Sequence, residues 1–465
     1  MNLILPLFEG FSLGTEMMLA LLPWLALIYY SVVLWDGKRF FLVFSGLLFI
    51  WSVSQFSFIA MGVIIALSLI NFGLLRLLQT SPRNAIFWGG IAFNLLVLIV
   101  FKYIPTSQLD KPLHLLGIYE SIQIIGLSFY VFHVVSVFAD IKSSRINEPI
   151  AFMTFMSYLL YFPKIITGPL IRYNAFKDEI DKPSISESFV MEGIGLIIIG
   201  LVKKAAADYI ALYPLSIYAN PSGYNGFDHL FAMYGFALYI FLDFSAYTDM
   251  ARGISRVFGI ELPNNFASPY RSTSMIEFWK RWHITLSTWI RDYLYIPLGG
   301  SRRGLGRSYF NVMIAFILSG IWHGVGANFA LWGAMHGIGV VVNRFVTSKM
   351  KIHYVWGWFF TFHWVSLGWI FFANPIDDAL LSLLKIFTDF RWDMIVTVIS
   401  NNWVWYLATF IGLIYSLWDD KVVVWWSSTF QKIHFILKVI VFWMVLGLVL
   451  FSHLGAVNVF IYQKF

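Results

Sequence analysis

The chain has no cysteine in its 465 residues and few charged residues. Without cysteine it forms no disulfide, offers no thiolate ligand to a metal and carries no acyl group as a thioester on its own side chains. Charged residues make up only 12% of the chain, hydrophobic residues make up 59%, and the mean hydropathy is +0.73. These values exclude a soluble globular protein.

Long apolar stretches recur from residues 17–34 to residues 439–452. A spanning helix needs about 20 mainly apolar residues, and every backbone polar group must be paired within lipid. We therefore predict an all-α polytopic membrane protein with about 11 to 13 membrane helices and short re-entrant or interfacial helices. No second domain is visible, so residues 1–465 are predicted to form a single integral-membrane domain.

Basic residues are missing from the beginning of the chain, because no lysine or arginine precedes Lys38 and both Glu9 and Glu16 are acidic. A cleavable secretory signal has a basic start, so we predict that the first apolar stretch is retained. Over the whole chain the net charge is +7, which in a membrane protein indicates basic cytoplasmic loops rather than nucleic-acid binding. The loops at 36–39 and 76–83 are predicted to face the cytoplasm, with both termini outside.

His283 lies on a predicted helix that runs from Ser274 to Arg291. A spacing of three and four residues places it on one helical face with Trp279, Leu286 and Ile290. A second histidine, His323, lies in residues 309–332, which contain no Asp, Glu, Lys or Arg. Ionisable groups inside a membrane are costly and mark functional sites, although histidines also serve as hydrogen-bond partners between helices.

Helix breakers and buried charges mark two further segments. Pro163, Gly168 and Pro169 predict irregular backbone at membrane depth, which is tolerated only where protein encloses it or where it lines a cavity. In the next segment, Asp249 and Arg252 are spaced as an ion pair. A structural role and a binding role for this pair remain open.

A cluster of basic residues lies between residues 280 and 307, separated by aromatic residues and a Gly-Gly turn: Lys280, Arg281, Arg291, Arg302, Arg303 and Arg307. Its charge predicts a cytoplasmic location. One interpretation is topology and contact with anionic lipids. The other is an electrostatic entrance for a phosphate-bearing substrate, because arginine and lysine bind phosphates.

Three motifs together resemble the membrane-bound O-acyltransferase family, in its bacterial branch of alginate O-acetylation and teichoic-acid D-alanylation proteins. The first motif is Asp243-Phe-Ser-Ala-Tyr-Thr-Asp249, and the third is Ile321-Trp-His-Gly324. The second runs from Glu277 to Gly300 and contains the tripeptides Arg-Trp-His and Arg-Asp-Tyr. The resemblance covers about residues 126–337 and the tail at 453–465. It implies a central funnel through a bacterial cytoplasmic membrane.

The resemblance also implies roles for individual residues. His323 matches the family's catalytic histidine and His283 its second functional histidine. The substrate-binding candidates are Asp243, Trp279, Arg281, Arg291, Asp292, Tyr295, Trp322, Arg302 and Arg303. The implied donor is acetyl-CoA, with no permanently bound cofactor, and the implied partners are an extracytoplasmic esterase-like (SGNH-type) acetyltransferase and membrane lipids.

The aromatic tail contains one phenol, Tyr462, and resembles the tyrosine-bearing end of a small partner peptide in the teichoic-acid system. Neutral His323 would act as the general base on a hydroxyl, which attacks the donor thioester. Tyr462 is a candidate for that hydroxyl and hence for an acyl relay. A phenol with a pKa of about 10 needs such a base near neutral pH.

Two alternatives remain open. The first is D-alanyl transfer to teichoic acid from a carrier protein. The second is a transporter or channel in which the buried histidines serve translocation without cleavage of a thioester. A metal site is not expected, because the two histidines have no clear third ligand.

Overall fold

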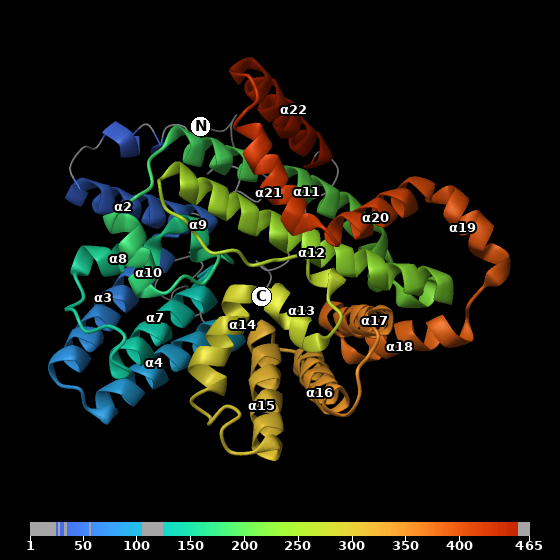
Figure 1. Cartoon of the computed structure of the whole chain (residues 1–465), viewed down its shortest axis with the longest axis horizontal. Coiled ribbons are helices and arrows are strands. Elements are labelled where there is room, and N and C mark those ends of the chain that lie inside the picture. Colours follow the sequence, from blue (N-terminus) through green and yellow to red (C-terminus); the bar gives the residue numbers. More distant parts are fainter. Residues whose placement is uncertain (1–24, 27, 32–34, 55–56, 105–123, 454–465) are drawn as a thin grey trace, which may run out of the picture. The chain divides into compact units, whose positions relative to one another are not determined.

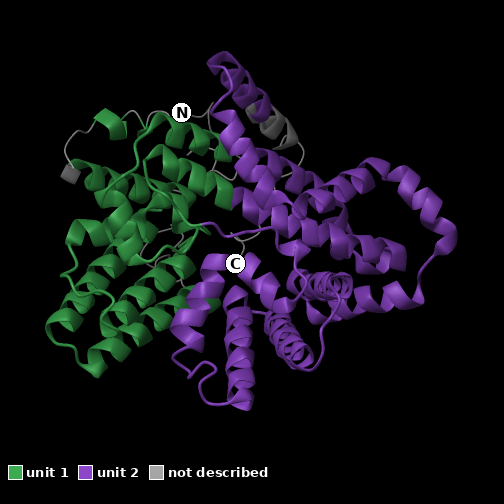
Figure 2. Cartoon of the chain, in the orientation of Figure 1, with its two compact units in different colours: residues 1–197, 248–263, 457–464 green, residues 198–247, 264–456, 465 purple. Residues whose placement is uncertain are grey.

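A computed structural model of the chain is shown in Figure 1 and describes residues 25–26, 28–31, 35–54, 57–104 and 124–453. All regular elements in these ranges are helices, which confirms the all-α architecture. The chain divides into two compact units (Figure 2). Unit 1 contains residues 1–197, 248–263 and 457–464, and unit 2 contains residues 198–247, 264–456 and 465.

Six helices among the described residues are long and apolar enough to cross a membrane: α3 (Phe58–Thr80), α4 (Asn84–Tyr103), α12 (Gly226–Val257), α15 (Leu305–His323), α16 (Ala327–Lys349) and α17 (Tyr354–Ala373). A pair bent by 89°, Trp392–Asn401 with Trp403–Ser416, would make a seventh span. The protein is therefore a multi-pass membrane protein. The prediction of about 11 to 13 spans was made for the whole chain, whereas this count covers only the described residues and omits most of the predicted stretch at 17–34. Among the described helices, α11 (Glu187–Ala219) carries Lys203, Lys204 and Asp208, and several apolar stretches form short helices.

Unit 1 is built from α3, α4, the first part of α11, the end of α12, and the following helices: α2 (Trp35–Val53), α7 (Leu127–Lys142), α8 (Phe152–Leu160), α9 (Phe162–Ile165) and α10 (Tyr173–Asp181). Two buried amides, Asn71 on α3 and Asn94 on α4, exchange hydrogen bonds of 3.0 and 2.7 Å. Such polar pairs fasten helices together where both are surrounded by apolar side chains.

The segment with Pro163 and Pro169 departs from helical structure, as predicted. After the short helix α9, residues 166–172 are irregular, and residues 166–171 are buried within unit 1. The enclosing protein is what makes irregular backbone tolerable in a membrane protein.

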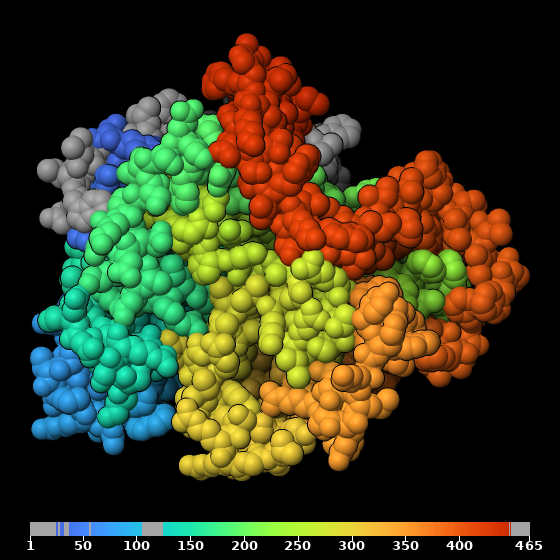
Figure 3. All heavy atoms as spheres, in the orientation of Figure 1, coloured from blue at the N-terminus to red at the C-terminus, as the bar shows by residue number. Residues whose placement is uncertain are grey.

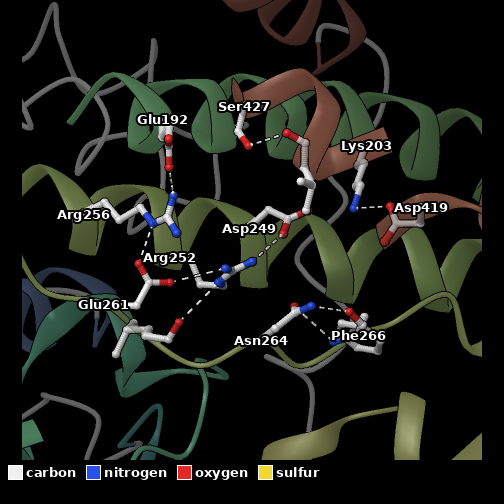
Figure 4. Close-up of polar contacts among 12 residues, drawn as sticks. Glu192, Lys203, Asp249, Arg252, Arg256, Glu261, Asn264, Phe266, Asp419 and Ser427 are labelled. Carbon is white, nitrogen blue, oxygen red and sulfur yellow. Dashed lines mark hydrogen bonds and ion pairs between the residues drawn. The ribbon is translucent and has the colours of Figure 1, made fainter. Parts of the chain in front are cut away.

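In unit 1, a network of ion pairs joins the beginning of α11, the end of α12 and the segment that follows α12 (Figure 4). Arg256 donates to Glu192 at 2.8 Å and to Glu261 at 2.6 Å. Arg252 donates to Glu261 at 3.4 Å and lies 3.9 Å from Asp249, so the predicted pair of Asp249 and Arg252 is present. These contacts join three chain segments and support a structural role for the pair.

Unit 2 contains most of α12, then α13 (Met275–Arg281), α14 (Ile284–Ile290), the π-helical turn η4 (Arg291–Tyr295), α15, α16 and α17. It ends with α18 (Ile376–Thr388), η5 (Trp392–Met394), α19 (Ile395–Asn401), α20 (Trp403–Ser416), α21 (Asp419–Phe430) and α22 (Phe435–His453). The short elements η2 (Pro221–Gly223) and η3 (Pro269–Arg271) lie in its loops. Two glycines bring α15 and α16 together, because a Cβ on Gly320 would lie 2.1 Å from the carbonyl oxygen of Phe329, and one on Gly333 would lie 2.3 Å from that of Phe316.

Candidate active site

The segment that was predicted as one helix from Ser274 to Arg291 forms two helices, α13 and α14. The chain turns at His283, whose φ of 42° lies in the left-handed region. The prediction of one continuous helical face is therefore wrong. Within α13, Arg281 donates to Glu277 at 2.9 Å, across one helical turn.

His283 is held by its surroundings in unit 2. Its side chain is buried, and its ring meets Phe244 edge-on at a centroid distance of 4.7 Å. Nδ1 lies 3.4 Å from Oδ1 of Asn265, which also accepts hydrogen bonds from the backbone and the hydroxyl of Thr285 at 3.2 and 2.6 Å. Asn265 thus fixes the imidazole relative to the first turn of α14, a role that the sequence did not reveal.

His323 is the last residue of α15 and is also buried. Its ring packs edge-on against Trp332 of α16 at 5.1 Å and against Phe372 of α17 at 5.3 Å, and it contacts the neighbouring Trp322 at 4.6 Å. The second predicted histidine therefore lies in a cluster of aromatic rings from three helices, which we call the aromatic cluster. Burial in this cluster keeps bulk water away from the imidazole.

A third histidine, His336 on α16, belongs to the same aromatic cluster and was missed in the sequence. It is completely buried and contacts Trp332 at 4.7 Å and Trp279 at 5.1 Å. Neither ring nitrogen of His336 has a hydrogen-bond partner among the described residues. The sequence signal was its position 13 residues after His323 in a segment free of acidic and basic residues.

Three buried indole nitrogens in the aromatic cluster also lack hydrogen-bond partners in the described part of the chain, those of Trp279, Trp332 and Trp369. Trp369 stacks on Trp332 at 5.7 Å and contacts Trp282, the neighbour of His283, at 4.9 Å. The rings therefore connect the surroundings of the two predicted histidines. Buried donors are normally paired, so these N–H groups are suited to bind a substrate oxygen or ordered water.

Asp243 takes part in a buried ion pair. Lys204 donates to Asp243 at 2.8 Å and to Asp208 at 2.7 Å, and all three side chains are less than a tenth exposed. A neighbouring pair, Lys203 and Asp419 at 2.5 Å, is also buried (Figure 4). The contacts with Lys204 give Asp243 a structural function that its motif alone did not predict.

Two of the predicted basic candidates, Arg302 and Arg303, are exposed in the turn before α15, at the other end of this helix from His323. A third, Arg291, donates to Asp292 at 2.7 Å. The hydroxyls of Tyr295 and Ser308 are 2.8 Å apart, and Arg344 of α16 donates to Ser308 at 3.0 Å. Arg344 is thus a further member of this group.

Burial raises the pKa of Tyr295, but hydrogen bonds from Arg344 and Ser308 outweigh it and lower the pKa below its ordinary value. The environment around the turn therefore stabilises negative charge. The last predicted catalytic residue, Tyr462, lies outside the described residues.

Known proteins resemble the chain over most of its length. The family model of membrane-bound O-acyltransferases matches residues 40–374. The chain is 32% identical over 305 residues to a probable alginate O-acetylase AlgI of Pseudomonas putida, which covers 63% of this chain and 62% of the relative. It is 31% identical over 355 residues to a peptidoglycan O-acetyltransferase of Helicobacter pylori, with coverage of 68% and 67%.

A teichoic acid D-alanyltransferase of Bacillus subtilis is 28% identical over 324 residues, with coverage of 65% of this chain and 81% of the relative. The chain spans about three fifths of the length of the alginate relative. The family match extends on both sides of the predicted core at 126–337. Because it also covers well over half of the chain, this protein belongs to the membrane-bound O-acyltransferase family.

Proposed function

We propose that the chain transfers an acetyl group from acetyl-CoA to a hydroxyl group, for the O-acetylation of a polysaccharide outside the cytoplasmic membrane of a bacterium. The single observation that carries this proposal is the aromatic cluster of unit 2. In it, buried His323 lies beside Trp332, whose indole N–H has no partner among the described residues. The acyltransferase family and the two O-acetyltransferase relatives support the same chemistry.

The aromatic cluster supplies a base and hydrogen-bond donors for acyl transfer. Neutral His323 removes the proton from the acceptor hydroxyl, whose oxygen attacks the thioester carbonyl. Indole N–H groups, such as that of Trp332, stabilise the negative charge on the carbonyl oxygen. The carbon–sulfur bond then breaks, the thiolate of CoA takes the proton from the imidazolium, and an ester remains. Exclusion of water protects the thioester from hydrolysis.

The exposed turn before α15 is proposed to bind the phosphates of the donor. Arginine side chains are well suited to phosphate oxygens, and Arg302 and Arg303 are both exposed there. Reversing both charges to Glu should raise the KM for acetyl-CoA at least tenfold and leave kcat within about twofold. An unchanged KM would contradict a role of this turn in donor binding.

Tyr462 is proposed as an acyl relay between His323 and an extracytoplasmic esterase-like (SGNH-type) acetyltransferase. Its phenol, with a pKa of about 10, would need the base. Mass spectrometry of the protein after incubation with acetyl-CoA should show an acetyl adduct on Tyr462. Absence of an adduct together with full glycan acetylation by Tyr462→Phe would refute the relay.

Release of free CoA by the purified protein in nanodiscs tests the central reaction. We expect His323→Ala to lose at least 99% of the release, whereas His434→Ala, a change at an exposed histidine, should retain it. Equal release by the parent and His323→Ala would refute the catalytic role of His323. Release from a D-alanyl carrier protein but not from acetyl-CoA would instead assign the activity named for the Bacillus subtilis relative.

A further inference from the structure

A polar pocket of about 400 Å³ lies in unit 2 and contains none of the predicted site residues. Its walls come from the second half of α11, the loop before α12, the first turn of α12, and residues 385–402. Figures 1 and 3 show the beginning of α12 (green) beside α18 (orange). The volume lies within the range of small-molecule sites, which is about 300 to 1,000 Å³.

Hydrogen bonds fix the walls of this pocket. The hydroxyl of Tyr213 donates to Asp228 at 2.5 Å, and the backbone N–H of Asn225 donates to the same carboxylate at 3.1 Å. Lys385 donates to the carbonyl oxygens of Ser222 and Tyr224. The pocket is thus preorganised, because side chains and backbone from separate segments hold one another.

Gly226 allows the closest approach in these walls. Its N–H donates to the carbonyl oxygen of Asp389 at 2.9 Å, and a Cβ at this position would lie 2.1 Å from the carbonyl oxygen of Lys385. A larger residue would push the start of α12 away from the end of α18.

Other polar groups of the lining remain available to a ligand. The side chain of Asp389 is 44% exposed, and its carboxylate lies 3.8 Å from Lys385. Asn401 is exposed, and the guanidinium of Arg391, itself 53% exposed, pairs with Asp393 at the rim. The lining offers both donors and acceptors, and two basic and two acidic side chains balance its charge. Such a lining does not suit the several phosphates of an acyl-CoA.

The helix α17 separates the pocket from a basic segment of unit 2. It follows Lys349 and Lys351, is long and apolar enough to cross a membrane, and leads to α18 at the pocket. Because basic residues mark the cytoplasmic side, α17 assigns the pocket to the outer side.

We propose that this pocket binds one sugar residue of the acceptor glycan outside the membrane. The proposal rests on the proposed O-acetyl transfer to a polysaccharide. Each sugar hydroxyl both donates and accepts hydrogen bonds. The amide of Asn401 can donate to it and accept from it, and the carboxylate of Asp389 can accept from it. Met394 and Val398 in the same lining provide apolar surface for the ring carbons. A partner protein would bury about 800 Å² of surface on each side. Such an interface is broad, whereas this pocket is small and concave.

The test measures binding of sugars to the protein in nanodiscs by saturation-transfer NMR. The probes are a neutral hexose tetrasaccharide and a uronic-acid tetrasaccharide. We expect at least one to bind the parent, and Asp389→Ala and Asn401→Ala each to weaken it at least fivefold. Asp377→Ala, a control at an exposed acid on α18 outside the pocket, should bind like the parent, as should His323→Ala.

Parallel measurement of CoA release separates the two proposals. If the parent releases CoA and binds neither sugar, the pocket proposal is overturned while acyl transfer stands. Sugar binding that the two pocket variants do not alter also overturns it. If these variants instead prevent capture of an SGNH-type partner without affecting sugar binding, the pocket is a protein-docking site and the sugar proposal is wrong. Sugar binding that depends on Asp389 and Asn401 supports the pocket even when no CoA is released, in which case only the acyl-transfer proposal fails.

Discussion

Lys204 lies between Asp208 and Asp243 in the interior of unit 2, at 2.7 and 2.8 Å from their carboxylates. Lys204→Met removes this cation, so it no longer offsets the repulsion between the two carboxylates. Breaking a buried ion pair by removing one partner costs about 3 to 5 kcal/mol. Because two carboxylates lose the same cation, we expect the upper half of that range, which is roughly a thousandfold in the unfolding equilibrium.

Asp243→Asn is expected to have a smaller effect, because Lys204 keeps Asp208. The loss of one hydrogen bond to a charged group is worth about 1.5 to 3 kcal/mol. Both variants should be compared with the parent by equilibrium unfolding in mixed micelles, with Lys432→Met as an exposed-lysine control. If Lys204→Met unfolds like the control, the ion pair does not stabilise the fold. If Asp243→Asn keeps its stability but raises the KM, Asp243 binds substrate.

Three further predictions concern other parts of unit 2. His336→Phe keeps a ring of similar size but removes both nitrogens. We therefore expect kcat for CoA release to fall at least tenfold, with little change in the unfolding temperature. An unchanged kcat would mean that the ring only packs against its neighbours. Gly320→Ala places a Cβ 2.1 Å from a carbonyl oxygen of α16 and should cost more than about 2 kcal/mol in unfolding free energy, whereas Gly306→Ala has open space and should be nearly neutral. Burial raises the pKa of Glu277, but hydrogen bonds from its neighbours outweigh it and hold the pKa below the ordinary 4.5. The carboxylate therefore stabilises the fold above that pH, and the unfolding temperatures of the parent and Glu277→Gln should converge as the pH falls below 4.5; a constant difference down to pH 3 would contradict this assignment.

Several features of the fold could be predicted because they depend on local sequence. Apolar runs identified the helices, Pro163 and Pro169 identified the irregular segment, and spacing identified the pair of Asp249 and Arg252. The turn at His283 could not be predicted, since a non-glycine residue in the left-handed region is imposed by tertiary contacts rather than by its own preference.

The candidate site was only partly predictable for a related reason. His323 stood out because its segment has no charged residues, but the roles of Asn265 and His336 arise from contacts between distant segments. Lys204 was passed over because α11 contains no motif that links it to Asp243, 39 residues away. The spacing of Gly320 with Gly324 and of Gly333 with Gly337 did carry a signal, because glycines four residues apart favour close packing of membrane helices.

The backbone contact of α15 with α16 at Gly320 and Gly333 restricts which movements can admit a substrate. No side chain separates the two helices at this point. Neither helix can slide or rotate without a clash between backbone atoms, so the two move as one rigid body. His323 lies three residues after Gly320, and His336 lies three residues after Gly333. Both imidazoles must therefore move together, and access to the base has to be gated by elements outside this pair, such as α17 or the turn with three positive-φ glycines at 299, 300 and 304.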